Sequence, residues 1–412
     1  MSVSRLGTRV IMLVANQYPP DARVQKEAKS LMASGYFVSV LSWDRERNRK
    51  LIEIVDGIPV RRFRHLYARG FASFFVSGCL FLVDCLMVLV REALQHERVV
   101  VHCHDFNTLP VGWLLRSLSG RFTLIYDSHE SFPELLLTIA PRIIATLVRA
   151  VERFMLARVD AVIAANDVIL QNLLEYSKAP GVAIYNTPPL AVSQISGPDT
   201  ENEISHLRDQ YGGETFVLLY YGTILRYRGL HALLDAADLT SESSSPKLIF
   251  LVVGDGPLAT SLYLEAQQRM LTHKVRFYPH VAFERAMRMV KAADAVYIGF
   301  EPEDPNNYFA SPNKLFEAMA VGTPVLASGF GFLGRLVQTL GCGVTLESIT
   351  GPSILAGIQR LLHEDVKKRC AANGLYWFKT YYNWDVMARR LNDIYRDVAP
   401  IHCTKNPHVE PI

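Results

Sequence analysis

The segment Ser311-Pro-Asn-Lys-Leu-Phe-Glu-Ala-Met-Ala-Val-Gly-Thr-Pro-Val-Leu-Ala327 predicts a capped helix that leads into a buried strand. Ser311 is a preferred N-cap residue, and Pro312 fits the first helical position. The backbone N–H groups of Asn313, Lys314 and Leu315 would then point at whatever lies before the helix. An anion is the favoured ligand at such a helix start.

Glu317 follows Asn313 by one helical turn, so the two side chains share a helix face. A carboxylate in this place can accept hydrogen bonds from the ribose hydroxyls of a nucleotide whose diphosphate lies at the helix start. Gly322 supplies the C-terminal stop. The segment therefore indicates a nucleotide-diphosphate cradle, and an ordinary capped helix with a solvated Glu is the alternative.

Length and composition indicate a globular protein of two domains, since the chain has 412 residues and 50% apolar residues. The net charge is only +3, without the dense basic clusters of a nucleic-acid-binding protein. The cysteines show no paired or metal-ligand spacing, which favours a reducing compartment and no structural zinc. They are Cys79, Cys85, Cys103, Cys342, Cys370 and Cys403.

The N-terminus enters a strand at once and lacks a signal peptide's apolar core, so we expect a cytoplasmic protein. Phe71–Val90 is very apolar, but Asp84 and several small residues interrupt it, which favours a buried or surface-docking helix over a membrane span. Four arginines precede this helix, and such a basic segment suits peripheral contact with anionic lipid. A core helix beside a solvated basic loop is the alternative. The four arginines are Arg61, Arg62, Arg64 and Arg69.

Apolar strand-like runs alternate with helix-length amphipathic segments, which is typical of parallel sheets with crossover helices. The expected strands are 10–14, 37–41, 99–103, 124–126, 161–164, 217–221, 248–253, 275–278, 295–298 and 324–327. Pro, Gly and polar residues break the pattern between Asn186 and about Glu214. The fold class is therefore α/β, with two doubly wound domains.

Ligands of doubly wound sheets bind beyond the carboxyl ends of the strands. In the first half, His102-Cys-His-Asp105 and Asp127-Ser-His-Glu130 end neighbouring strands. A zinc site from His102, His104 and His129 is conceivable only if the strand continues through both of the first two histidines, and we expect no metal.

Two loops of the second half also follow strands. Tyr221–Leu230 opens a helix and carries Arg226 and Arg228, which can clamp phosphate oxygens. The loop at Gly254 matches a loose dinucleotide pattern, but the acidic residue that a nicotinamide site needs is missing from Val275–His280. A nicotinamide enzyme is therefore disfavoured.

The order of these motifs resembles the retaining glycosyltransferase family 4, whose GT-B fold has two Rossmann-like domains facing a central cleft. The resemblance runs nearly end to end. It rests on Asp21–Ala28, His102–Asp105, Tyr126–Glu130, the Gly222 loop, Val253–Pro257 and, most specifically, Ser311–Glu317.

The resemblance implies an acceptor-side domain at 1–195, to which a crossover helix at 384–398 returns, a donor-binding domain at 196–383 and a loose tail at 399–412. It implies that Glu317 binds the donor ribose, while Asn313, Lys314 and Leu315 meet the diphosphate together with Arg228. Gly222, Thr223, Arg226 and Gly254 lie in the implied donor loops. His129 would contact the transferred sugar.

Three positions depart from the family pattern. A second Glu is usual eight residues before the ribose one, where this chain has Phe309; Glu301, Glu303 or Asp304 can substitute. Thr223 occupies the place of a phosphate-binding Arg, for which Arg226 can stand in. The loop Asn16–Arg23 lacks the paired glycines that often approach the donor phosphate.

The residues themselves suit glycosyl transfer, because fixed cations and helix N–H groups stabilise the charge that develops on a departing diphosphate. The chain has no Asp-x-Asp pair that would hold a metal-bound diphosphate. We therefore expect a metal-independent transferase with His129, Asp105, Arg228 and Lys314 in the reaction, and the resemblance implies that it retains the anomeric configuration. It would use a UDP- or GDP-linked donor and no cofactor. Asp105 would serve as a polar contact or as the base for the acceptor.

The expected acceptor is a glycan or a lipid-linked molecule, which the enzyme would meet at the cytoplasmic face of a membrane. The expected pathway is polysaccharide or glycoconjugate biosynthesis. A non-catalytic GT-B scaffold or glycan-binding relative and a nucleotide-sugar epimerase are the alternatives. Nucleic acid is not an expected partner. The sugar, the nucleotide, the linkage and the oligomeric state are not encoded in any pattern that we recognise.

Overall fold

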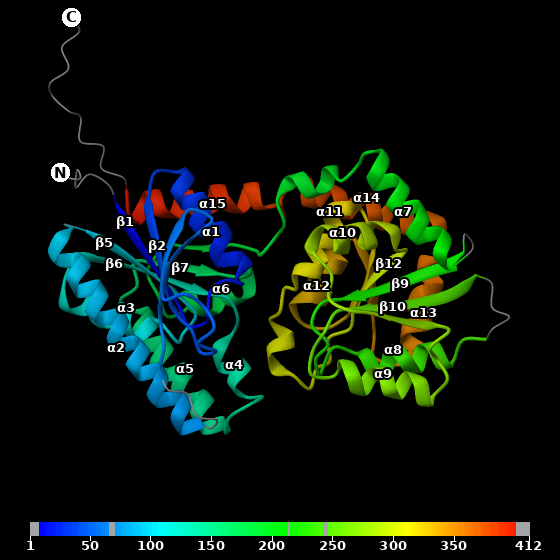
Figure 1. Ribbon diagram of the computed structural model, residues 1–412, viewed down its shortest axis with the longest axis horizontal. Helices are drawn as coiled ribbons and strands as arrows, with labels where there is room; N and C mark the ends of the chain where they lie inside the picture. The colour runs from blue at the N-terminus through cyan, green and yellow to red at the C-terminus, as the bar shows by residue number, and fades with distance from the viewer. Residues whose placement is uncertain (1–7, 66–70, 97, 213–214, 242–245, 401–412) are drawn as a thin grey trace, which may run out of the picture. The chain divides into compact units, whose positions relative to one another are not determined.

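The computed structural model describes residues 8–65, 71–96, 98–212, 215–241 and 246–400. Contacts between Cα atoms divide the chain into a first unit, Met1–Tyr185 with Ala388–Ile412, and a second unit, Asn186–Met387. Each unit contains one sheet that is covered by helices (Figure 1).

The sheet of the first unit has the strand order β3-β4-β2-β1-β5-β6-β7-β8. All neighbouring strands are parallel except β3 and β4, which form an antiparallel pair at the edge. The strands are β1 (Arg9–Val14), β2 (Phe37–Trp43), β3 (Ile52–Val55), β4 (Ile58–Phe63), β5 (Val99–His104), β6 (Phe122–Ser128), β7 (Ala161–Ala164) and β8 (Gly181–Ala183).

Two sets of helices cover this sheet, with α1 and α15 on one face and α2, α3 and α5 on the other (Figure 1). The helices are α1 (Ala22–Ala33), α2 (Phe71–Gln95), α3 (Leu109–Leu118), α4 (Phe132–Leu136), α5 (Arg142–Leu156) and α6 (Asp167–Leu174), with the end of α15 (Trp384–Val398). A Cβ atom at Gly112 would lie 2.5 Å from Leu124 Cδ1 and 2.6 Å from Cys103 Sγ. Helix α3 therefore packs closely on the sheet.

The second unit has a wholly parallel sheet in the order β11-β10-β9-β12-β13-β14. Its strands are β9 (Thr215–Tyr221), β10 (Lys247–Val253), β11 (Val275–Tyr278), β12 (Ala295–Ile298), β13 (Val325–Ser328) and β14 (Gly343–Leu346). Its helices are α7 (Pro198–Tyr211), α8 (Leu230–Asp238), α9 (Ala259–Gln268), α10 (Phe283–Ala292), α11 (Asn313–Val321), α12 (Gly331–Leu340), α13 (Gly351–Leu361) and α14 (Glu364–Thr380), with short 3₁₀ turns η1 (Leu190–Gln194) and η2 (Pro305–Tyr308).

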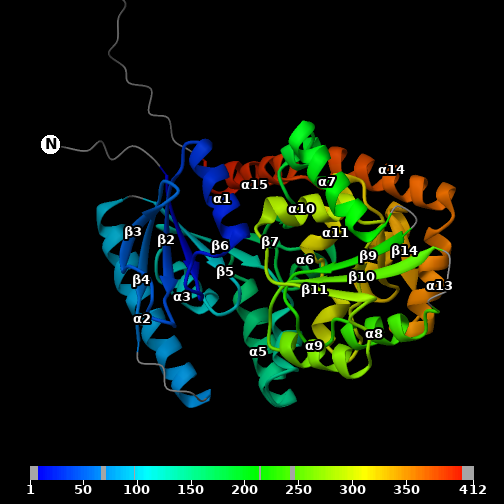
Figure 2. The same ribbon diagram turned by 45° about the vertical axis from the view of Figure 1, so that its right-hand side comes forward.

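Helices α8 and α9 lie below the sheet of the second unit in Figure 2, and α10 and α11 lie above it. A continuous apolar core joins the lower helices and α13 to the sheet; it includes Leu233, Phe250 and Ile358. The upper helix α11 is held by its own buried residues, and the ring of Phe316 stacks on Tyr382 at 5.3 Å. Its N-terminus is thus fixed relative to the carboxyl ends of the strands.

The ten strands expected from the sequence are all present, each within two residues of the predicted bounds. The pattern missed β3, β4, β8 and β14, of which three are edge strands and β4 lies next to an edge. Edge strands are short and only partly buried, so their sequences lack a continuous apolar run. The cysteines that the structure describes are all free thiols.

The first residue of the expected loose tail is packed against the first unit. Ala399 is buried, and its carbonyl accepts a hydrogen bond of 3.1 Å from the Tyr36 hydroxyl. The remainder of that segment, residues 401–412, lies outside the described residues.

Candidate functional site

The start of helix α11 differs from the predicted cap. Asn313 is the first helical residue, and Pro312 is the N-cap with extended backbone and no side-chain cap bond. The N-cap is therefore Pro312 and not Ser311, one residue later than the sequence predicted. The Leu315 N–H donates to the Pro312 carbonyl at 3.0 Å, so only the amides of Asn313 and Lys314, among the three predicted, remain for an anion.

Lys314 lies half-buried beneath the loop that follows β9. Its Nζ atom is 3.7 Å from the centre of the Tyr220 ring, and its Cε atom would lie 3.0 Å from a Cβ at Gly222. Burial, followed by the charge of Arg228, lowers the pKa of Lys314 to about 7. No carboxylate of the described residues lies close enough to Lys314 to keep its pKa at the usual value. A bound anion would act as the missing partner and raise the pKa again.

Glu317 is oriented by a buried tyrosine at the end of β9. The Tyr221 hydroxyl donates to Glu317 Oε2 at 2.6 Å. Burial and the neighbouring Glu317 charge raise the pKa of Tyr221 well above its usual value, so the phenol keeps its proton. One oxygen of the carboxylate is therefore held in place by the protein itself.

The loop after β9 presents its two arginines differently. Arg226 is exposed, whereas Arg228 is half-buried and lies with its guanidinium 4.4 Å from the Phe300 ring centre. Arg228 NH1 donates to Asn307 Oδ1 at 2.7 Å. Thr223 is exposed, and its carbonyl accepts a hydrogen bond from Tyr220 at 2.5 Å. Arg228 is the fixed cation of this loop.

Gly254 has a packing role. Its φ is +145°, and a Cβ there would lie 2.0 Å from the Gly222 carbonyl oxygen. The two loops can therefore touch only because this residue lacks a side chain. The loose dinucleotide pattern at Gly254 thus reflects contact between two loops of the second unit.

The three acidic residues offered in place of Phe309 have different surroundings. Glu301 Oε1 accepts the Gly229 N–H at 2.9 Å, so this side chain braces the loop that carries Arg228. Asp304 caps η2 by accepting the Asn306 N–H at 3.0 Å. Glu303 is exposed. The first two carboxylates already bind backbone amides.

Asn307 positions Arg228 and was not found from the sequence. Its side chain is 1% exposed, and Nδ2 donates to the carbonyls of Tyr227 at 3.3 Å and Glu301 at 2.8 Å. No sequence motif marks it. The only hint was its place in a polar loop after a strand.

Replacing Asn307 with Ala is expected to weaken donor binding about tenfold, because Arg228 loses its fixed acceptor and two carbonyls lose their donor. Calorimetric titration with the nucleotide-sugar donor measures the change in Kd. Asn307→Asp retains the acceptor for Arg228 but not the donor to the two carbonyls, so it should recover only part of the affinity. An unchanged Kd in Asn307→Ala would contradict a positioning role.

In the first unit, a buried ion pair lies beneath the ends of β5 and β6. Arg23 NH2 and Nε donate to the two oxygens of Asp127, at 2.6 and 3.2 Å, and Nε lies 3.0 Å from Glu27 Oε1. All three side chains are buried. Burial opposes ionisation of Asp127, but the charges of Arg23 and His129 and the hydrogen bonds from the histidines together hold its pKa well below the usual value.

The three histidines converge on Asp127, because β5 continues through His102 and His104. These two rings stack with centres 4.2 Å apart. His104 Nδ1 is 3.2 Å from Asp127 Oδ2, and His129 Nε2 is 3.1 Å from the same oxygen. The His129 backbone N–H donates to Asp105 Oδ1 at 2.9 Å.

The electrostatics separate these histidines. Burial lowers the pKa of His104 to about 3, so it is neutral. Burial also opposes the charge of His129, but Asp105 and then Asp127 overcome it and raise its pKa to about 10. His129 is therefore an imidazolium at neutral pH, able to donate a hydrogen bond and unable to act as a base. Asp105 is the more exposed carboxylate, with 35% of its side chain accessible.

Among the described residues, Glu27, His102, His104 and Asp127 form a buried group whose ligand atoms all lie within 4.8 Å of one another. Such a set has the chemistry of a metal site. Arg23 already pairs with both carboxylates, however, and its charge opposes a cation there. His129 is not part of this set.

The end of α15 packs under the histidines. The Tyr395 hydroxyl is 2.8 Å from His102 Nδ1, and its ring meets that of Tyr36 edge-on at 5.2 Å. Along this helix Leu391 and Ile394 are buried, while Val386 is half-buried. The helix thus ends as part of the first unit.

The arginines before α2 were expected to form a basic surface, but two of them, Arg62 and Arg64, are paired with carboxylates. Arg62 is 2% exposed, pairs with Glu53 at 2.6 Å, and donates to the Tyr18 carbonyl. Arg64 pairs with Asp44 at 2.8 Å. Arg61 is exposed over the Phe63 ring, and Arg69 lies outside the described residues. Alternation along β4 explains the difference, since successive side chains face opposite sides.

Helix α2 is confirmed over the predicted segment, and it extends to Gln95. Within the described part of the chain, no helix combines the length and hydropathy needed to cross a bilayer.

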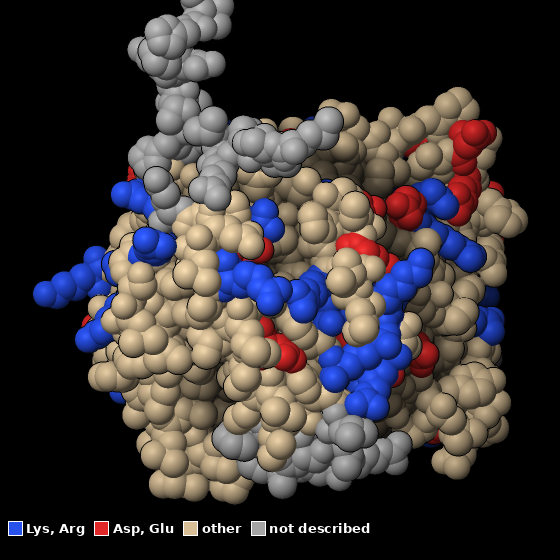
Figure 3. Space-filling model, turned by 60° about the vertical axis from the view of Figure 1, so that its left-hand side comes forward, with Lys and Arg blue, Asp and Glu red and all other residues tan. Residues whose placement is uncertain are grey.

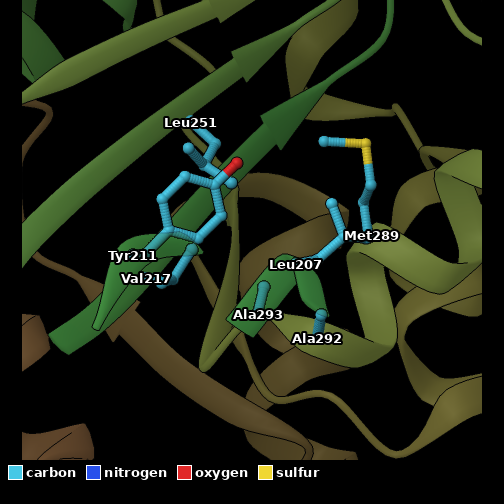
Figure 4. A pocket seen from close by; sticks show the side chains of 7 residues that line it. All are labelled: Leu207, Tyr211, Val217, Leu251, Met289, Ala292 and Ala293. Atoms are coloured by element: carbon cyan, nitrogen blue, oxygen red, sulfur yellow. The ribbon is translucent and has the colours of Figure 1, made fainter. Parts of the chain in front are cut away.

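Two hollows accompany these residues: the first lies away from them, and the wall of the second includes Ser128, which stands between Asp127 and His129 in the chain. The one in Figure 4 is an apolar space of about 10 Å³ between α7, α10 and the strands β9 and β10, which fits little more than a water molecule. The other, of about 380 Å³, lies in the first unit beside α4, α5 and α6, with Glu134, Arg149 and Glu152 in its wall. Burial raises the pKa of Glu152 to about 7, and its Oε1 accepts from Tyr126 at 2.5 Å.

Three residues that prove important in the structure were assigned no role from the sequence, namely Arg23, Glu27 and Tyr221. Arg23 and Glu27 entered only through the resemblance, and Tyr221 only as a strand end. The signal for Arg23 was available, because Arg23 and Glu27 are one turn apart on a helix that begins at the carboxyl end of β1.

Comparisons with known proteins agree on both halves of the chain. Residues 20–186 match the glycosyl transferase 4-like domain, and residues 206–376 match the glycosyl transferases group 1. Alpha-D-kanosaminyltransferase of Streptomyces kanamyceticus is 22% identical over 317 residues, which are 75% of this chain and 80% of that protein.

Solved structures give the same fold. Sucrose-phosphate synthase from Thermosynechococcus elongatus superposes with a TM-score of 0.73 at 20% identity, over 95% of this chain and 98% of the other. Anabaena HepE in complex with UDP superposes with a TM-score of 0.68 at 17% identity, over 95% and 100% of the two chains. The two matched domains, in this order and on this two-sheet fold, make the chain a member of the group 1 glycosyltransferases of GT-B fold, enzymes that act on nucleotide sugars.

Proposed function

We propose that this glycosyltransferase takes its sugar from a UDP- or GDP-linked donor bound at the start of α11, retains the anomeric configuration, and requires no divalent metal. The carrying observation is that Lys314, Arg228 and the α11 amides come from converging loops of one unit, with Glu317 fixed one turn further on. HepE, a structural neighbour, is described in complex with UDP, which supports a nucleotide of this class.

The proposed reaction breaks the bond between the sugar C1 and the diphosphate oxygen and forms a bond from C1 to an acceptor hydroxyl oxygen. The electron pair of the broken bond stays on the diphosphate. Lys314, Arg228 and the helix amides stabilise that charge most strongly in the transition state, which is the requirement for catalysis. Two fixed cations take the place that a metal ion has in metal-dependent transferases.

We assign the first unit to the sugar and the acceptor. His129, as an imidazolium, would donate to a hydroxyl of the transferred sugar. Asp105 is the partly exposed carboxylate beside it, and we propose it as the group that accepts the acceptor's proton. Burial raises the pKa of Asp105, which brings a carboxylate closer to the basicity that proton transfer requires.

Donor binding tests this proposal. In a thermal-shift panel of UDP- and GDP-sugars, one donor class should stabilise the wild type equally with and without EDTA. Glu317→Ala should abolish most of that shift, since it removes the ribose contact. Glu347→Ala, which changes an exposed carboxylate of the same unit, is the matched control. Silence of the whole panel would favour a non-catalytic relative, and loss of the shift in EDTA would overturn metal independence.

Donor affinity should also depend on pH through Lys314. Its pKa is about 7 in the free protein, and a bound diphosphate raises it, so binding takes up a proton. The affinity should be highest below pH 7 and fall as the pH rises, by at most tenfold per unit. Titration calorimetry between pH 6 and pH 8.5 measures this fall. Lys314→Arg stays charged and should give a flat profile; a flat wild-type profile would contradict the assignment.

We further propose a glycan or lipid-linked acceptor, met at the cytoplasmic face of a membrane, in polysaccharide or glycoconjugate biosynthesis. Two relatives have names that support this: the putative colanic acid biosynthesis glycosyl transferase WcaI of Escherichia coli, 25% identical, and the alpha-monoglucosyldiacylglycerol synthase of Streptococcus pneumoniae, 26% identical. Arg62 and Arg64 are paired with carboxylates, so the basic segment before α2 is a poor membrane-binding surface. Contact with a membrane would have to use another surface.

A further inference from the structure

The first unit has a wide apolar surface that no described element covers. Of the large apolar residues that are exposed in the described chain, half lie on α2, α3, α5 or the turn before α5. On α2 they recur at intervals of three and four residues, and between 44% and 78% of each side chain is exposed. They are Val76, Leu80, Val83, Met87, Val90 and Leu94.

The opposite side of α2 already packs on the sheet through Phe81, Cys85 and Leu89, which are at most 1% exposed. The helix is thus apolar on two sides, one more than a helix on the surface of a soluble unit needs. Helix α3 adds exposed Leu118, and α5 adds Ile143 and Phe154. Because α3 lies between α2 and α5 on one face of the sheet, these residues form one surface (Figure 1).

The charges beside this surface have one sign. Arg91, Arg142 and Arg153, on the helices themselves, are exposed. The described carboxylates of the three helices are turned inward and paired: Asp84 with His65 at 2.7 Å, Glu92 with Arg9 at 2.6 Å, and Glu152 with the Tyr126 hydroxyl. Figure 3, which turns the first unit forward, shows Lys and Arg outnumbering Asp and Glu, next to a broad area that carries neither.

We propose that the surface formed by α2, α3 and α5 docks on an anionic lipid bilayer, with its apolar side chains in the interface and its arginines at the headgroups. Apolar area and cations together give stable interfacial binding, and each alone gives little. A second copy of the chain fits less well. Two such surfaces would bring arginines against arginines, without the opposite charges that pair helices. The inference extends the proposed function by naming where a lipid-linked acceptor would be met.

Vesicle co-sedimentation of the full chain, without donor, tests the proposal. Vesicles of phosphatidylcholine with phosphatidylglycerol should pellet the wild type, and phosphatidylcholine alone should pellet much less. Binding should weaken as salt is raised. Met87→Glu with Phe154→Glu should lower the partition coefficient about tenfold or more, and Arg91→Glu with Arg142→Glu should remove the preference for phosphatidylglycerol. Leu239→Glu, at an exposed leucine of the second unit, is the control and should bind as the wild type does.

Donor thermal shift of the Met87→Glu/Phe154→Glu protein separates this proposal from the proposed function. An unchanged shift demonstrates that the variant is folded with its donor site intact. The proposal is overturned if the wild type ignores anionic vesicles or if the apolar double variant binds them equally well. It is also overturned if light scattering finds a dimer that this variant converts to a monomer, because a second copy then occupies the surface.

Discussion

Replacing Lys314 with Met is expected to lower the rate of sugar transfer by about 10²–10³-fold, while the protein stays folded. The removed ammonium group faces the departing diphosphate in our proposal, and loss of one such fixed group costs a factor of this size. Folding should not suffer. Burial lowers the pKa of Lys314 to about 7, so the free protein carries this charge at a cost that Met does not incur.

Steady-state kinetics with the donor from the thermal-shift panel measure this effect, and the loss should fall mainly on kcat. Lys379→Met, at an exposed lysine of the same unit, is the control and should leave kcat unchanged. A variant that keeps more than about a third of the wild-type kcat would exclude Lys314 from leaving-group stabilisation.

Replacing Asp127 with Asn is expected to cost about 3–5 kcal/mol of unfolding free energy, because it leaves the Arg23 guanidinium buried without its main partner. The size of the effect follows from burial, since Asp127 is 0% and Arg23 3% exposed. The pKa of Glu27, which burial and then Asp127 raise to about 8, should fall in the variant as the neighbouring negative charge disappears. Ionised Glu27 would compensate in part.

The urea transition followed by circular dichroism measures this loss. Asp56→Asn removes a carboxylate that pairs with Lys29 on the surface, and it should leave the transition where it is. The double variant Arg23→Met/Asp127→Asn should be less destabilised than the sum of its single variants, because it removes both buried charges. Additive effects would mean that the ion pair is not the source of the loss.

The sign of the pH dependence follows from the same pair. The pKa of Asp127 is depressed in the folded state, so its contribution is present above the carboxylate's unfolded pKa and is lost as the pH falls through the lower, folded value. Glu27 acts oppositely: its folded pKa is raised, so its contribution is lost as the pH rises towards about 8. The joint contribution of these two carboxylates to stability should therefore be largest at mildly acidic pH.

The order of apolar runs and helix-length segments was enough to predict two parallel sheets, because strands buried on both faces must be apolar throughout. The same logic located residues that follow strands, including Arg228 and His129. It failed at β3, β4, β8 and β14, where partial burial leaves no continuous apolar signal.

The sequence by itself determined the two sheets, the presence of a helix over Asn313–Glu317 and the presence of His104 and His129 at strand ends, since these depend on local periodicity. Only the tertiary structure decided what these side chains do. Asn307 fixes Arg228 from 79 positions away, and Tyr221 fixes Glu317 from 96 positions away. The charge of His129 depends on Asp105 and Asp127, and the inward turn of Arg62 on the pleat of β4. Hydrogen bonding and desolvation act at a few ångströms in space, so no spacing along the chain encodes them.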